Sequence, residues 1–113
     1  MKLLVFDTSS RAVLLVGVVS DGKLEQSFTD TGDVSVNLAK RIAELWPDEM
    51  EAVVVACGPG SYTGIRIGLA AAKGLALARG NPVFGMDSGT LESLASRADE
   101  AVKQGRNPEP TYD

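Results

Sequence analysis

The sequence contains no histidine and only one cysteine, and these absences narrow the chemistry available to it. Without histidine, the chain lacks the commonest metal ligand and the usual general base near neutral pH. A single cysteine, Cys57, cannot form an intrachain disulfide, and its place in an apolar run predicts a buried, reduced thiol. We therefore expect neither a metal site nor another cofactor.

Long apolar segments and concentrated positive charge are also missing. No stretch approaches the ~20 apolar residues of a membrane helix, and Asp7 interrupts the N-terminal apolar residues where a signal peptide would continue. Fifteen acidic and eleven basic residues give a net charge of -4, and no basic cluster could neutralise many phosphates. These features predict a cytoplasmic chain that neither enters a membrane nor binds nucleic acid by itself.

The 113 residues are enough for one compact domain, and 44% of them are hydrophobic, so a core can be buried. Expected strands cover residues 3–6, 12–20, 23–29, 51–57 and 83–86, and expected helices cover residues 34–45, 61–79 and 90–104. The order βββαβαβα predicts an α/β fold, with a mixed five-stranded sheet flanked by helices. Two prolines in residues 105–113 predict a loose tail or a linker.

A glycine-rich loop between the fourth strand and the second helix is the most informative segment. Its members are Gly58, Pro59, Gly60, Ser61, Tyr62, Thr63, Gly64, Arg66 and Gly68. Taken alone, such a loop is as consistent with an ordinary strand-to-helix turn as with a functional site. In an ordinary turn of this kind, glycine adopts positive φ and serine caps the helix. A Walker loop is excluded because the Gly-Lys-Ser/Thr ending is missing. Pro59 and the position after the fourth strand exclude the dinucleotide-binding fingerprint.

As a whole, the string GPGSYTGIRIG resembles the motif GPGSFTGxRIG of the TsaB (YeaZ) family. The resemblance continues through residues 72–76 (AKGLA), and residues 4–9 (LVFDTS) resemble the first strand and Asp-Thr-Ser turn of that family. It covers residues 1–104. The resemblance implies the N-terminal lobe of the actin, heat-shock ATPase and sugar-kinase fold, which is ribonuclease H-like. Residues 105–113 would then start a linker to a second lobe that is missing here.

The resemblance also implies a non-catalytic role in making threonylcarbamoyladenosine in tRNA. TsaB proteins support the catalytic subunit TsaD, TsaE is a further expected partner, and a homodimer is expected when the chain is alone. The alternative is a degenerate nucleotide-binding phosphotransferase that uses Asp7, Thr8 and Ser9, because this turn lies near the nucleotide phosphates in the wider superfamily. Against it, no second lobe is present to close a nucleotide site.

The second expected helix carries apolar residues on several sides, and many of its residues are small. In the TsaB family the first two helices pack against the equivalent helices of TsaD or of a second copy. We therefore expect a partner interface on these helices, made of Val34, Leu38, Ile42, Leu45, Ile65, Leu69, Ala72 and Ala76. The alternative is that the sheet and a neighbouring helix of the same domain cover these side chains.

Overall fold

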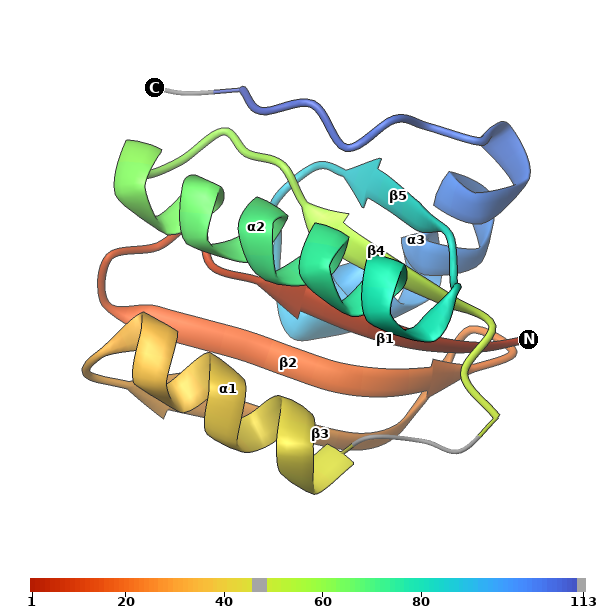
Figure 1. The fold of residues 1–113 in the computed structure, drawn as a ribbon, viewed down its shortest axis with the longest axis horizontal. Coiled ribbons are helices and arrows are strands. Elements are labelled where there is room, and N and C mark those ends of the chain that lie inside the picture. Colours follow the sequence, from red (N-terminus) through yellow and green to blue (C-terminus); the bar gives the residue numbers. More distant parts are fainter. Residues whose placement is uncertain (46–48, 112–113) are drawn as a thin grey trace.

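A computed structural model describes residues 1–45 and 49–111, which form one mixed sheet with helices on both faces (Figure 1). The strands are β1 (Lys2–Asp7), β2 (Val13–Ser20), β3 (Lys23–Thr31), β4 (Ala52–Ala56) and β5 (Val83–Met86), and the helices are α1 (Val34–Leu45), α2 (Tyr62–Arg79) and α3 (Leu91–Gln104). The expected order of elements is confirmed. Each boundary lies within two residues of the expected one.

The strands lie in the order β3-β2-β1-β4-β5. The β1–β2 and β2–β3 pairs are antiparallel, and the β1–β4 and β4–β5 pairs are parallel. All five residues of β4 are buried, as expected for an apolar strand at the centre of a sheet that is covered on both faces. In β3, at the edge of the sheet, only alternating side chains such as Leu24 and Phe28 are partly buried. Because β1 and β4 are parallel neighbours, their carboxyl ends lie side by side.

Helices α1 and α2 cover one face of the sheet and α3 covers the other (Figure 1). Successive strand residues supply opposite faces, so Leu4 and Phe6 pack beneath α1 and α2, whereas Leu3 and Val5 pack beneath α3. Full burial of each such side chain contributes roughly 1.5–3 kcal/mol. None of the helices in the described part of the chain is long and apolar enough to cross a membrane.

Residues 105–111 are not the loose tail that the prolines predicted. The backbone N–H of Gly85 donates to the carbonyl of Arg106 over 2.9 Å, and the N–H of Thr111 donates to the carbonyl of Cys57 over 2.7 Å. Gly85 belongs to β5, an edge strand whose outward backbone groups need partners, and Cys57 directly follows β4. Residues 112 and 113 of the expected tail lie outside the described residues. That the segment starts a linker stays a prediction.

Candidate functional site

β1 ends in a buried acidic turn. Asp7 is 4% exposed, and its Oδ1 accepts hydrogen bonds from the N–H of Ser9 (2.8 Å) and from its Oγ (2.5 Å). The other carboxylate oxygen, Oδ2, accepts from the N–H of Gly89 at 3.2 Å. Three donors of the chain thus surround the carboxylate, as a buried charge requires. Asp7 therefore links the end of β1 to the loop that follows β5.

Thr8 joins the same turn to α2. Its side chain is fully buried, and its hydroxyl donates to the carbonyl of Gly64 at 2.5 Å. A Cβ atom on Gly64 would overlap the backbone oxygen of Thr8, and one on Gly68 would overlap the hydroxyl. These two glycines of the motif therefore allow the first turns of α2 to pack directly on the turn.

The first half of the glycine-rich motif also serves packing. Gly58 has a φ of 112°, which favours glycine, and its carbonyl accepts from the N–H of Ser88 at 2.9 Å. The N–H of Ser61 donates to the carbonyl of Ser9 over 2.7 Å. The hydroxyl of Ser61 caps α2 by accepting from the N–H of Gly64 at 3.3 Å. A Cβ atom on Gly60 would overlap Ser9, so this loop lies flat against the β1–β2 turn.

Three members of the motif point outward instead. Tyr62, Thr63 and Arg66 are exposed on α2, and Arg66 Nη1 donates to the hydroxyl of Tyr62 at 2.6 Å. The guanidinium carbon of Arg66 also lies 5.2 Å from the centre of the tyrosine ring, a cation–π distance. The motif therefore combines an inward set of small residues with an outward aromatic and basic pair.

In residues 1–45 and 49–111, no group of three or more Cys, Asp and Glu side chains is arranged to hold a metal ion. Cys57 is buried, and this burial raises the pKa of its thiol. The expectation of a buried thiol is confirmed.

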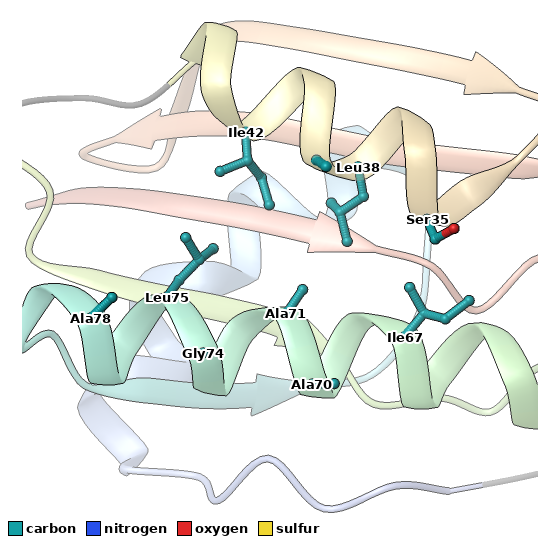
Figure 2. A pocket seen from close by; sticks show the side chains of 10 residues that line it. Ser35, Leu38, Ile42, Ile67, Ala70, Ala71, Gly74, Leu75 and Ala78 are labelled. Atoms are coloured by element: carbon teal, nitrogen blue, oxygen red, sulfur yellow. The ribbon is translucent and has the colours of Figure 1, made fainter.

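An apolar groove of about 520 Å³ runs between α1 and α2 (Figure 2). From α1, Leu38 and Ile42 point toward α2, and from α2, Ile67, Ala71 and Leu75 point back toward α1 (Figure 2). The complete lining is Ser35, Leu38, Ala39, Ile42, Ile67, Ala70, Ala71, Gly74, Leu75 and Ala78. This lining contains no charged side chain, so the surface of the groove is largely apolar.

Most residues predicted for the partner interface are instead core residues of this domain. The buried ones are Leu38, Ile42, Leu45, Ile65, Leu69 and Ala72. Val34 and Ala76 are partly buried, and only Leu38 and Ile42 also line the groove. The physical reason is that the large apolar side chains of both helices face the sheet. For α2 the periodicity could not show this, because apolar residues occur on several sides of that helix. On the same helices, Ala39, Ala70 and Gly74 are exposed instead.

The sequence analysis did not single out two apolar side chains that are exposed in the structure. Leu77 is 88% exposed on α2, and Val36 is 63% exposed on α1. Each lies one helical turn from a groove residue, Leu77 from Gly74 and Val36 from Ala39. The sequence signal that could have pointed to this surface was Gly74. A glycine inside a helix costs ~1 kcal/mol relative to alanine, so its presence needs another reason.

Comparison with known proteins relates this arrangement to one family. The model of the family described as TsaD, tRNA N6-adenosine threonylcarbamoyltransferase, matches residues 15–110. An uncharacterized protein of Mycobacterium leprae is 35% identical over 108 residues, covering 84% of this chain and 29% of that protein. The tRNA threonylcarbamoyladenosine biosynthesis protein TsaB of Bacillus subtilis is 45% identical over 53 residues, covering 47% of this chain and 22% of that protein.

Solved structures agree with the sequence relatives. YeaZ from Pseudomonas aeruginosa matches with a TM-score of 0.66 and 27% identity, over 76% of this chain and 43% of that one. RuvC from Thermus thermophilus, at 18% identity, has a TM-score of 0.59 over 98% of this chain and 86% of that one, a likeness of fold alone. The expected ribonuclease H-like fold is thus confirmed.

The chain spans less than half the length of the TsaB and YeaZ proteins that it matches. The family model, in contrast, covers most of the chain, and the TsaB and YeaZ matches agree with the motif that the sequence carries. The chain therefore belongs to the tRNA N6-adenosine threonylcarbamoyltransferase (TsaD) family, as a TsaB-like member.

Proposed function

We propose that this chain is a non-catalytic partner subunit in the synthesis of threonylcarbamoyladenosine in tRNA. It would support a TsaD-like catalytic subunit by docking that subunit on the outward surface of α1 and α2. The TsaD family model and the TsaB relative support the pathway. A homodimer through the same surface when the chain is alone, a TsaE-like further partner and a cytoplasmic location belong to the same proposal.

The observation that carries the docking role is Gly74. This residue lies in the middle of α2, and a Cβ atom placed on it would meet no described atom within 4 Å. The fold of the chain therefore gains nothing from the missing side chain, although a glycine at this position costs ~1 kcal/mol relative to alanine. A partner helix gives the glycine a role, because a missing side chain lets two backbones approach closely.

The exposed apolar side chains beside the groove support the same role. Leu77 and Val36 are both mostly exposed, and burying a leucine or valine side chain fully contributes roughly 1.5–3 kcal/mol. Single exposed apolar residues are common on proteins. Here, however, they flank a continuous apolar groove, and a partner that fills the groove would cover them too.

The surroundings of Asp7 support a non-catalytic role over the phosphotransferase alternative. Its two carboxylate oxygens already accept hydrogen bonds from Ser9 and Gly89. The hydroxyl of Thr8 already donates a hydrogen bond to the carbonyl of Gly64. A carboxylate that contacts a metal-bound phosphate needs an oxygen directed at its ligand. The acidic turn is therefore better suited to holding the lobe together.

Reconstitution of the transfer reaction tests the proposal. TsaD-like and TsaE-like subunits of the same organism would be mixed with tRNA, and threonylcarbamoyladenosine would be measured with and without this chain. We expect transfer to fall at least tenfold when the chain is omitted, and no transfer from the chain alone. The folded Asp7→Asn variant should support transfer like the parent. Transfer that needs the Asp7 carboxylate, or equal transfer without the chain, would contradict the proposal.

A further inference from the structure

Helices α1 and α2 concentrate positive charge on an acidic chain. Together they contain five basic residues and one acidic residue, namely Lys40, Arg41, Arg66, Lys73, Arg79 and Glu44. The remaining segments contain six basic and fourteen acidic residues. The layer that lines the groove thus has the opposite sign of charge from the rest of the protein.

The charges of α2 lie beside the groove. Arg66 and Lys73 are exposed and seven residues apart, so they lie two turns from each other on one side of the helix. Ala70 lies between them and lines the groove. A shallow hollow of about 380 Å³ adjoins the groove here, lined by Tyr62, Thr63, Arg66, Ile67 and Ala70. The groove is therefore continuous with a basic edge.

The local ion pairs do not cancel this edge. Glu44, the one acid of the two helices, lies 2.8 Å from Arg41, which also contacts Asp30 at 2.6 Å. Arg66 donates to the hydroxyl of Tyr62 and lies over its ring, and neither contact is an ion pair. The positive charge of Arg66 and Lys73 is therefore presented to whatever occupies the groove.

We infer that this surface docks a different subunit, whose apolar helical face is bordered by Asp and Glu, in preference to a second copy of this chain. The inference rests on the proposed function and names the chemistry of its partner. A twofold homodimer would use the same surface on both copies and would bring both basic edges to one contact. An acidic border on the partner would instead pair with Arg66 and Lys73, which favours the correct complex and speeds its formation.

Salt separates the two kinds of association, because screening has opposite effects on them. The full chain would be studied at roughly 0.05 M and 0.5 M sodium chloride, at which the Debye length falls from roughly 14 to 4 Å. Its self-association would be measured by analytical ultracentrifugation, and its Kd for the TsaD-like subunit by calorimetry. We expect the Kd for the TsaD-like subunit to rise about tenfold with salt. Self-association should stay unchanged or become stronger.

Charge reversal tests whether Arg66 and Lys73 cause the salt dependence of binding. The double variant Arg66→Glu with Lys73→Glu should weaken binding of the TsaD-like subunit at least tenfold at low salt, without weakening self-association. A matched control reverses two exposed lysines elsewhere, Lys23→Glu with Lys103→Glu, which changes the net charge equally. The control should bind within about threefold of the parent. All four positions are exposed, so both variants should fold, and circular dichroism would verify this.

The outcomes are distinct. If the TsaD-like subunit binds but salt and charge reversal affect it no more than the control variant, the inference is wrong and the proposed function stands. If that subunit does not bind at either salt concentration, both are wrong. If tRNA alone binds and loses affinity in the Arg66 and Lys73 variant, the basic edge is a nucleic-acid surface and the inference is overturned.

Discussion

The buried hydroxyl of Thr8 donates a hydrogen bond to the backbone carbonyl of Gly64, across 2.5 Å in space and 56 positions in the chain. One turn further along α2, the hydroxyl occupies the space that a side chain at Gly68 would need. The contact joins the end of β1 to the beginning of α2. In this structure the glycines of the motif thus position a helix, and this positioning determines which side of α2 faces outward.

The first prediction compares glycines of the same helix. Gly64→Ala and Gly68→Ala should each lower the free energy of unfolding by ~1–3 kcal/mol, because the added methyl group would overlap Thr8. Gly74→Ala should raise it by up to ~1 kcal/mol, since the position is open and alanine favours a helix. Urea unfolding measures all three. Equal stabilities would show that the motif glycines are not needed for packing.

The second prediction concerns the acidic turn. Asp7→Asn should lower the free energy of unfolding by ~1.5–3 kcal/mol, because an amide can accept the present hydrogen bonds through one oxygen only. The control is Asp87→Asn, which removes an exposed ion pair with Arg106 and should cost less than ~1 kcal/mol. Urea unfolding and ATP titration would be run on both variants. Unchanged stability of Asp7→Asn together with lost ATP binding would favour the phosphotransferase alternative.

The third prediction places the same substitution on opposite sides of α2. Leu69→Glu should cost about 4 kcal/mol or more and leave the chain largely unfolded, since Leu69 is 6% exposed and faces the sheet. Leu77→Glu should change stability by less than ~0.5 kcal/mol, because Leu77 is 88% exposed. Thermal unfolding followed by circular dichroism measures both. A stable Leu69→Glu variant would mean that α2 is rotated relative to this description.

The fourth prediction uses Cys57 to probe the C-terminal segment. The thiol of Cys57 is buried beside Gly85. The backbone of Asn107 and Pro108 lies close to the same glycine. Burial raises the pKa of the thiol. Less thiolate therefore forms at neutral pH, and alkylation should be at least ~100-fold slower than in the urea-unfolded chain. Deleting residues 106–113 should speed alkylation at least tenfold. An unchanged rate in a folded deletion variant would show that the segment does not protect this site.

The local elements were predictable because their signals are short-range. The turn between β2 and β3 follows from Asp21-Gly22, and both residues adopt positive φ as a tight hairpin turn requires. The run of apolar residues from Ala52 to Ala56 predicted a central strand, and β4 is buried along its whole length.

Features that depend on distant residues could not be predicted. Leu69 and Leu77 are the same residue type in one helix, but Leu69 packs in the core beneath α2 and Leu77 is exposed. The contacts of α2 with the sheet and with Thr8, which lie far away in the sequence, separate the two positions. Similarly, the N–H of Gly89 donates to Asp7, 82 positions away in the chain, and the N–H of Gly85 donates to Arg106. No local pattern carries information about such contacts.

The most direct test of the docking role is the Kd between this chain and the TsaD-like subunit when the open position on α2 is filled. Gly74→Trp places a large side chain where the described structure has none, so the chain should fold as well as the parent. The control Ser96→Trp makes a similar change at an exposed position on α3, on the other face of the sheet. We predict binding at least tenfold weaker for Gly74→Trp, about 1.4 kcal/mol or more, and unchanged for Ser96→Trp. Parent-like binding by the Gly74→Trp variant would contradict docking on this surface.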